Sequence, residues 1–455
     1  MAKAQTVALI EIRSSPQTDD DFLCWSPVPA RAKLSQPSST DLPVTLRSAG
    51  VGPSAGVVGF MVSPSPVTRA NYAPENELQI VLKADGSWTE FYLMGLKASD
   101  GNKDIAVRAE VPDGTAIGQT MTMVRVRKNA EQLSHRERNN FLSALAQWKI
   151  MPGLARPTRF EDFFTTHGDA FSHGIHSAFG TKPSNFLPWH RAFLLNFERE
   201  LQFIDPTVSL PYWKFDEPSP RLFNADFLGA KVLGSNEVDL AATNPIRGWS
   251  SPSGQLLTRA RAADTLAPIA TDVLPALACS MHGCPDVFRQ TTDTFEMNYH
   301  NGAHGFIQGW LGGATSPRDP LFFLLHANVD RGWAHWQQAR DRYDSASNRS
   351  YSPEGVYPGS VQGGMREGLY ANDEMWPWSQ KQGNWGTPNE PDDDWLPYRF
   401  SFPPALGLPL SGTDYPTPAK MIDYMGVFRG ADLGFCYDDL HYMSGGSSGV
   451  IAGEQ

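Results

Sequence analysis

The chain has 455 residues, more than one ordinary hydrophobic core accommodates, so we expect two domains or one large domain with a satellite. A hydrophobic content of 41% with 19% charged residues is typical of a globular protein and excludes an intrinsically disordered one. The formal net charge is −11 and no basic run offsets it, which argues against nucleic acid as a partner.

No stretch of 18 or more apolar residues occurs, so the sequence predicts no membrane span. The first residues, MAKAQTVALIEIRSS, reach Arg13 before an apolar segment develops, and we therefore expect no signal peptide and a cytoplasmic location. Four cysteines are too few for a disulfide framework, which fits a reducing compartment. The sequence leaves a homo-oligomer open.

Residues 1–130 are predicted to form a β-rich domain. Short β-branched or aromatic runs alternate with turn signals, and Asp-Gly, a dipeptide favoured in hairpins, occurs at 85–86, 100–101 and 113–114. Seven short strands of this kind favour a small sandwich. Whether this domain shields a site, packs against the rest or mediates oligomerisation stays open. The expected strands are Thr6–Arg13, Pro43–Ser48, Val57–Ser63, Leu78–Lys83, Trp88–Met94, Asp104–Glu110 and Thr120–Arg127.

From residue 131 the hydrophobic period becomes helical. Ser134 and Glu137 have the spacing of a capping box, and so do Thr158 and Glu161. Helical segments then alternate with long loops rich in proline and glycine. Residues 444–455 are predicted to form a flexible tail. We therefore predict a mainly α fold: an antiparallel helix bundle with long irregular loops over 131–443, preceded by the β-sandwich-like domain.

Histidines recur on the apolar faces of the predicted helices. His167 lies on one such stripe, His190 on the face of a helix expected to begin at Pro188, and His326 on that of a helix beginning at Asp319-Pro320. The segment HNGAH adds two more histidines, at 300 and 304, one helical turn apart. A single histidine on an apolar face is usually a satisfied core residue, but four segments that share the pattern indicate a common site.

Several neutral imidazoles buried together would leave lone pairs unpaired, at a cost of about 1–3 kcal/mol each, and a bound metal removes that cost. Imidazole suits copper, zinc, iron and nickel. No inward carboxylate accompanies these histidines as in di-iron bundles, and closed zinc sites usually include cysteine. An all-imidazole set large enough for two metals favours copper.

Two long motifs carry a family resemblance. NFLPWHRAFLLNFE, residues 185–198, closely resembles the CuA signature of type-3 copper proteins, the group of tyrosinases, catechol oxidases and haemocyanins. HNGAH, residues 300–304, followed by DPLFFLLHANVDR, residues 319–331, resembles the CuB signature of that family. GFCYD, residues 434–438, looks like the aromatic motif that closes the family's core. The similarity covers about 130–443.

The resemblance implies two copper ions held by six histidines. For the middle ligand of the first copper we prefer His176, with His173 as the alternative. The spacing between His176 and His190 is longer than the family's usual gap. Asp330 is expected to orient a ligand imidazole, or else to form a salt bridge with an arginine, and Phe322 is expected to wall the site. The implied metal ligands are His167, His176, His190, His300, His304 and His326.

For function, the resemblance implies a copper-dependent phenol oxidase that uses O2 as co-substrate. It would ortho-hydroxylate monophenols and oxidise o-diphenols to o-quinones, with small-molecule phenols as its partners. Hydroxylation requires the phenolate form of the substrate. Free phenol has a pKa of about 10, so a base must remove its proton. Glu296 and Asn301, which flank His300, are predicted to hold a water that serves as this base. Alternatively, Glu296 only stabilises the start of its helix.

Other functions stay open at the level of sequence. An o-aminophenol oxidase, or a catechol oxidase without monophenolase activity, would share the same copper centre. A reversible oxygen carrier of the haemocyanin type is a hypothesis from a different functional class, a carrier rather than an enzyme. This chain lacks the repeats of such carriers. A dizinc hydrolase is a more distant alternative.

A second cluster of soft ligands lies in the segment CSMHGC. Cys279, Met281, His282 and Cys284 form a set that suits Cu(I), and they are candidates for copper delivery to the site. A loop disulfide or two inert thiols explain the same residues.

Overall fold

The computed structural model describes residues 7–13, 21–63, 74–150, 160–172, 176, 185–269, 295–351, 370–373, 375–378, 416–427 and 432–442. The chain divides into two units. The β unit comprises Met1–Arg127 together with Tyr424–Gln455, and the helical unit comprises Lys128–Asp423. The helical unit is therefore inserted in the chain between two parts of the β unit.

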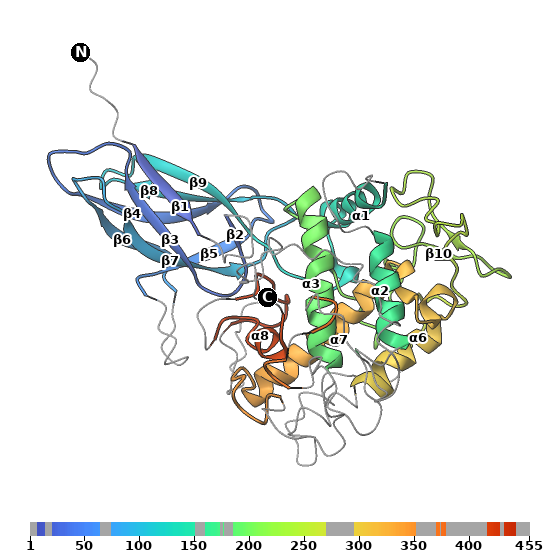
Figure 1. The fold of residues 1–455 in the computed structure, drawn as a ribbon. Coiled ribbons are helices and arrows are strands. Elements are labelled where there is room, and N and C mark those ends of the chain that lie inside the picture. The colour runs from blue at the N-terminus through green and yellow to red at the C-terminus, as the bar shows by residue number, and fades with distance from the viewer. Residues whose placement is uncertain are drawn as a thin grey trace. The chain divides into compact units, whose positions relative to one another are not determined.

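The β unit contains two antiparallel sheets, except that β2 and β9 pair in parallel (Figure 1). The four-stranded sheet has the order β1 (Ala8–Ile12), β3 (Val28–Leu34), β7 (Thr89–Lys97), β5 (Val57–Met61). The five-stranded sheet has the order β2 (Phe22–Leu23), β9 (Ala116–Val124), β8 (Ile105–Glu110), β4 (Leu42–Gly50), β6 (Glu77–Leu82).

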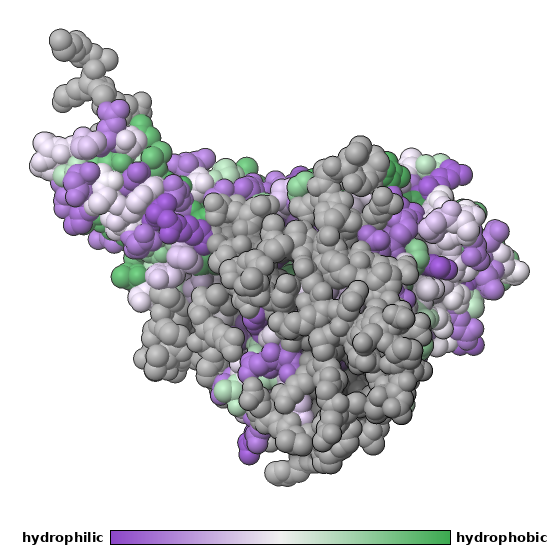
Figure 2. Space-filling view, in the orientation of Figure 1, coloured by the Kyte–Doolittle hydropathy of each residue, from purple (hydrophilic) through white to green (hydrophobic). Residues whose placement is uncertain are grey.

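The two sheets share one hydrophobic core. Along β3, buried residues alternate with more exposed ones, as expected for a strand with one face inward. Ala30 and Ala32 of β3 are fully buried, as are Leu46 and Val107 from the other sheet. The outer surface of the unit in Figure 2 is mostly hydrophilic or weakly polar, with a few hydrophobic residues among them. This division between inside and outside explains why the alternating runs form strands here.

All seven predicted strands are present, with ends shifted by a few residues. The predicted Asp-Gly turns are also present: Gly86, Gly101 and Gly114 all have positive φ, a conformation that suits glycine. Two strands of the β unit were not predicted. β2 has only two residues, and β3 contains Pro29 and two alanines, which have low strand propensity, although it lies between β1 and β7.

The helical unit is built around the long helices α3 and α7, with α2 packed beside α3 (Figure 1). Phe163 of α2, Phe193 and Phe197 of α3, and Phe323 of α7 form a fully buried aromatic cluster between these helices. Within the described residues the α-helices are α1 (His135–Ile150), α2 (Phe160–Ser172), α3 (Phe186–Ile204), α6 (Asn301–Ile307), α7 (Leu321–Arg340) and α8 (Pro418–Ile422). Two short strands, β10 (Ala230–Lys231) and β11 (Val238–Asp239), pair with each other.

Local signals set several helix starts. The Ser134 hydroxyl accepts from the backbone N–H of Glu137, whose carboxylate accepts from the N–H of Ser134, so the predicted capping box is present at α1. The Asp319 carboxylate accepts from the N–H of Leu321, the first residue of α7. The prediction for α3 was wrong by two residues: the helix begins at Phe186 rather than at Pro188.

Two expectations about architecture need correction. About 30% of the chain is helical and 23% lies in strands, so "mainly α" describes only the helical unit. Residues from Tyr424 onward group with the β unit, whereas we expected the helical domain to extend to residue 443. Backbone hydrogen bonds explain the difference, because the N–H of Arg127 donates to the Cys436 carbonyl at 2.8 Å. Among the described residues, no helix is long and apolar enough to cross a membrane.

Candidate metal centre

Three histidines of the helical unit form what we call the first triad: His167, His176 and His190. His167 lies on α2, His190 on α3, and His176 in the connection between these helices. One ring nitrogen from each lies within 4.8 Å of those of the other two, and every side chain is at most 5% exposed. The preferred middle candidate, His176, is thus placed in the group. The competing His173 lies outside the described residues.

Main-chain carbonyls orient two imidazoles of the first triad. Nδ1 of His167 lies 2.7 Å from the Ala314 carbonyl oxygen, and Nδ1 of His190 lies 2.8 Å from that of Phe186. A carbonyl can only accept, so each Nδ1 donates and the lone pair stays on Nε2. Neither ring nitrogen of His176 has a hydrogen-bond partner, and neither does Nε2 of His190. The triad therefore presents buried lone pairs without protein donors.

The second triad consists of His300, His304 and His326. A π-helical turn, Phe295–His300, leads directly into α6, which places His300 and His304 on one side, while His326 comes from α7. Nε2 of His326 lies 3.1 Å from Nε2 of His300 and 3.4 Å from Nε2 of His304. Nδ1 of His304 donates to the Leu311 carbonyl at 2.6 Å, so its lone pair also lies on Nε2.

The two triads lie against each other. The rings of His190 and His326 stack with their centroids 4.1 Å apart, and the His190 and His300 centroids are 6.3 Å apart. The Phe322 ring contacts both triads, with centroid distances of 4.1 Å to His326 and 4.8 Å to His167. Phe322 is fully buried. Phe322 therefore packs against imidazoles of both triads as well as in the core, and its role as a wall of the metal site stays a prediction.

Burial lowers the pKa of every one of these imidazoles, because desolvation disfavours the charged form. The pKa of His176 falls to about 3 and that of His304 to about 4. Neighbouring imidazoles contribute further to the lowered pKa values of His167, His190 and His326. At neutral pH all six rings are uncharged, which is the form that binds a metal.

The donor set fits two copper ions. Each triad supplies three neutral imidazole nitrogens, and among the described residues these triads are the two groups of His, Cys, Asp or Glu side chains spaced to hold a metal. Imidazole is a good ligand for copper. A metal would also satisfy the buried lone pairs of His176 and His190, which are otherwise costly.

The orienting role predicted for Asp330 is not observed. Its carboxylate accepts from Nε of Arg191 at 2.6 Å, and both side chains are at most 1% exposed. Nδ1 of His326, the imidazole it was expected to orient, has no hydrogen-bond partner. The alternative, a salt bridge with an arginine, is therefore correct. We had expected that salt bridge to be exposed, whereas the pair is buried. Because Arg191 follows His190 and Asp330 lies one turn after His326, the ion pair joins the two helices that carry these ligands.

Glu296 and Asn301 lie next to the second triad. Glu296 is 4% exposed in the π-helical turn that ends at His300. Asn301 is exposed, and its Oδ1 accepts from Nδ1 of His300 at 3.0 Å. Asn301 thus orients a triad imidazole, a contact that was not predicted. The candidates for copper delivery, Cys279, Met281, His282 and Cys284, lie outside the described residues.

The contacts that sequence reasoning missed are mostly made by main-chain atoms. The carbonyls of Phe186, Leu311 and Ala314 each fix one imidazole, and no side-chain pattern reveals a carbonyl. The Phe186 ring also lies near both triads, 4.5 Å from His190 and 4.9 Å from His300 between centroids. Its position at the start of the FLPWHR motif was the available signal.

The fold and the site together define a class: a binuclear metalloprotein in which a helical core places two histidine triads side by side. The comparisons with known proteins narrow this class. The family model described as the common central domain of tyrosinase matches residues 157–339, a range that contains all six histidines.

Curated relatives agree with that match. The chain is 33% identical to a tyrosinase of Streptomyces antibioticus over 56% of this chain and 93% of that protein. It is 32% identical to a tyrosinase of Streptomyces glaucescens, over 56% and 92%. A solved polyphenol oxidase variant from Thermothelomyces thermophila is 26% identical, covers 48% of this chain and 70% of its own, and has a TM-score of 0.35, too low to carry a structural argument.

The chain belongs to the tyrosinase family. It is an oxidoreductase of the tyrosinase type, with two copper ions as its cofactor and dioxygen as co-substrate. The two histidine triads are positioned to bind the metal ions.

Proposed function

We propose that this enzyme hydroxylates monophenols at the ortho position and oxidises o-diphenols to o-quinones. The observation that carries the proposal is the contact between the two triads, in which His190 and His326 stack at 4.1 Å. Two-metal enzymes hold their ions about 3.5–4 Å apart, so that one substrate can reach both. When bound, the copper pair supplies the two-electron chemistry with dioxygen. The remaining steps depend on the protein.

In this proposal the six histidines hold the two ions, and their neighbours fix the geometry. The carbonyls of Phe186, Leu311 and Ala314 hold three imidazoles with Nε2 directed at the metal. Phe186 and Phe322, both fully buried, keep bulk water away from the ligands. Low water content strengthens metal–ligand interactions and protects reactive intermediates.

Hydroxylation also requires that the phenol lose its proton. Free phenol has a pKa of about 10, so a base must take this proton when the pH is close to neutral. Glu296 is a buried carboxylate four residues before His300 of the second triad, whereas the equally near Asp330 is already paired with Arg191. We assign it the role of holding the water that accepts the proton. Asn301, exposed beside His300, supports this water and orients the imidazole.

The test is a comparison of two reactions in Glu296→Gln. This variant keeps the size and shape of the side chain but replaces one acceptor oxygen with an amide NH2 group and removes the carboxylate that holds the water. Monophenol turnover should fall roughly 100-fold, the lower end of the usual effect of losing a general base. Diphenol turnover should stay within about twofold, because an o-diphenol needs no hydroxylation and is far easier to oxidise.

The alternative role of Glu296 gives a different result. If Glu296 only stabilises the start of its helix, the thermal midpoint of Glu296→Gln should fall and both turnovers should fall together. Unchanged monophenol turnover would likewise contradict the assigned role. Asn301→Asp, which keeps an oxygen acceptor for His300, serves as the matched control for the neighbouring position.

A substrate panel separates this function from its competitors. Oxidation of catechol without turnover of a monophenol would indicate a catechol oxidase, and a preference for o-aminophenol would indicate an o-aminophenol oxidase. Reversible oxygen binding without quinone formation would indicate a carrier. Quinone formation from both a monophenol and a catechol is the outcome that we expect.

A further inference from the structure

Two cysteines of the β unit meet in its core although they are 412 positions apart in the chain (436 − 24). Cys24 directly follows β2, and Cys436 lies in the C-terminal segment. Both are free thiols, at 4% and 0% exposure, and both belong to the same core cluster. Neither takes part in the metal centre, which belongs to the helical unit.

Main-chain hydrogen bonds hold the two cysteine segments in place. The backbone N–H of Gly95 donates to the Cys24 carbonyl, and that of Arg127 donates to the Cys436 carbonyl, each at 2.8 Å. The indole N–H of Trp25, next to Cys24, donates to the carbonyl of Tyr437, next to Cys436, at 2.7 Å. The two thiols are therefore fixed as neighbours by the fold.

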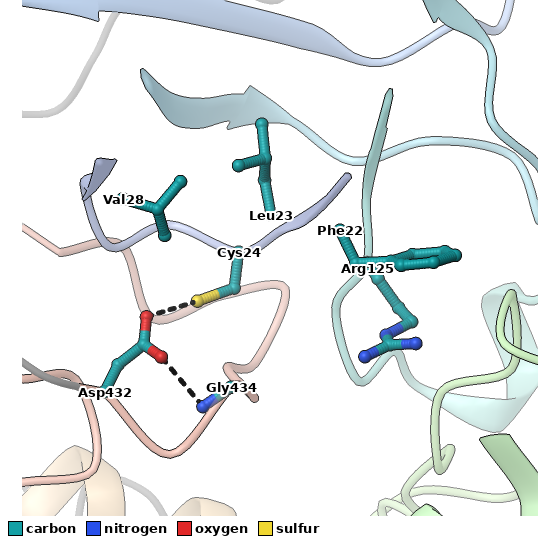
Figure 3. Close-up of a pocket in the computed structure, with 7 residues that line it drawn as sticks. All are labelled: Phe22, Leu23, Cys24, Val28, Arg125, Asp432 and Gly434. Carbon is teal, nitrogen blue, oxygen red and sulfur yellow. Dashed lines mark hydrogen bonds between the residues drawn. The ribbon is translucent and has the colours of Figure 1, made fainter. Parts of the chain in front are cut away.

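A carboxylate and a small cavity adjoin the Cys24 thiol (Figure 3). Oδ2 of Asp432 accepts from the Cys24 sulfur at 3.5 Å, while Oδ1 accepts from the N–H of Gly434 at 2.9 Å. Asp432 is only 5% exposed. The adjoining cavity has a volume of about 10 Å³, close to what one water molecule needs. It is lined by Phe22, Leu23, Cys24, Val28, Arg125, Asp432 and Gly434.

The two thiols differ in their surroundings. Burial raises the pKa of the Cys436 thiol well above its usual value, and its hydrogen bond with Cys24 adds to this effect. Cys436 therefore keeps its proton, whereas the proton of Cys24 already points to a carboxylate. Cys24 lines the cavity and its S–H donates to Asp432, so it is the sulfur that an oxidant in the cavity would meet first. A metal is not the better explanation, because these residues are not among the metal-spaced groups in the described part of the chain.

We propose that Cys24 and Cys436 are a redox-active pair that a small hydroperoxide converts into a disulfide. Asp432 accepts the Cys24 proton, and the sulfur attacks the peroxide. The O–O bond breaks, Cys24 becomes a sulfenic acid, and water leaves when the oxidant is hydrogen peroxide. The Cys436 sulfur then displaces the hydroxyl group from Cys24, which forms the S–S bond and releases a second water. In total, two thiols lose two electrons and one peroxide gains them.

The position of this bond in the chain gives it a structural consequence. The helical unit, Lys128–Asp423, is inserted between the two parts of the β unit that carry Cys24 and Cys436. A disulfide would tie those parts together and close a very long loop, which restricts the unfolded chain. The oxidised protein should therefore unfold at a temperature several degrees higher than the reduced one.

The experiment uses the full chain with Cys279→Ser/Cys284→Ser, which leaves Cys24 and Cys436 as the two cysteines of the sequence. The folded protein is treated with hydrogen peroxide, denatured, alkylated and mapped by mass spectrometry. We expect both thiols to disappear together, a linked peptide pair that dithiothreitol reverses, and a higher unfolding midpoint. Two thiols that remain alkylatable after the treatment, or a Cys24 that oxidises without linking to Cys436, would overturn the proposal.

Two further variants in the same background assign the steps. Cys436→Ser should stop at a sulfenic acid on Cys24, detectable with dimedone, because the second thiol is missing. Asp432→Asn should slow disulfide formation by roughly 100-fold if the carboxylate acts as the base. A rate equal to that of the parent would contradict the role assigned to Asp432.

Discussion

The two histidine triads reach similar sets of donors by different routes. In the first triad, each histidine comes from a separate segment, and all three are at most 5% exposed. In the second, His300 and His304 are four residues apart at the junction of a π-helical turn and α6, and both are only partly buried. Only His326, from the long helix α7, is fully buried there.

The two triads therefore differ in how much their geometry depends on core packing and in how close they lie to solvent. The first triad is buried, and its rings pack against Trp189 and Phe322, so its geometry depends on the packing of the core. The second depends on a short helix whose outer side faces solvent, next to the exposed Asn301. We therefore expect a substrate to approach from the side of the second triad and a core mutation to affect the first triad more strongly.

The largest expected effect is the loss of one ligand from either triad. His190→Ala and His304→Ala should both reduce catechol oxidation to background, because dioxygen chemistry needs both metal ions. The two variants should differ in their unfolding temperatures. His304→Ala should unfold close to the parent temperature, whereas His190→Ala should unfold at a lower temperature because it leaves a cavity in a fully packed region. Activity assays and thermal unfolding of both variants measure this. Substantial oxidation by either variant would contradict the shared role of the triads.

The next effect concerns the buried ion pair between the two ligand helices. Asp330→Asn removes the buried carboxylate that accepts from Nε of Arg191, so the free energy of unfolding should fall by about 3–5 kcal/mol. Chemical denaturation measures the change. Glu77→Gln, which breaks an exposed pair with Arg47, is the matched control and should cost less than about 1 kcal/mol. Similar losses in the two variants would show that burial does not set the strength of the Arg191–Asp330 pair.

The smallest effect is a change in pH dependence. Burial lowers the pKa of His176 from 6.5 to about 3 in the folded state, so between these values the unfolded chain binds a proton that the folded chain does not. The stability of the chelator-treated protein should therefore fall as the pH drops from about 6.5 towards 3. His176→Gln should show a shallower slope in thermal unfolding at a series of pH values. Identical slopes would contradict the burial of His176.

The sequence predicted the elements whose pattern is regular. All seven strands with alternating or β-branched runs are present, and five of the six triad histidines lie in helical segments, while His176 lies in a connection. What escaped prediction depends on tertiary contacts. β3 became a central strand despite Pro29 because its alanines fit between the sheets, and Asp330 pairs with Arg191 only because α3 packs against α7.

The same limit applies to the C-terminal segment. GFCYD looks like the motif that closes the family's core, and its residues group with the β unit. The Arg127 guanidinium stacks on the Phe435 ring at 3.9 Å and donates to the Tyr437 hydroxyl at 2.9 Å. A cation–π contact between residues 308 positions apart (435 − 127) leaves no local trace in the sequence.

Copper content tests the central claim most directly. After reconstitution with a copper salt and removal of excess metal, the parent protein should retain two copper ions per chain, and His190→Ala and His304→Ala should each retain about one. Retention of two ions by either variant, or of fewer than two by the folded parent, would contradict the assignment of one metal ion to each histidine triad.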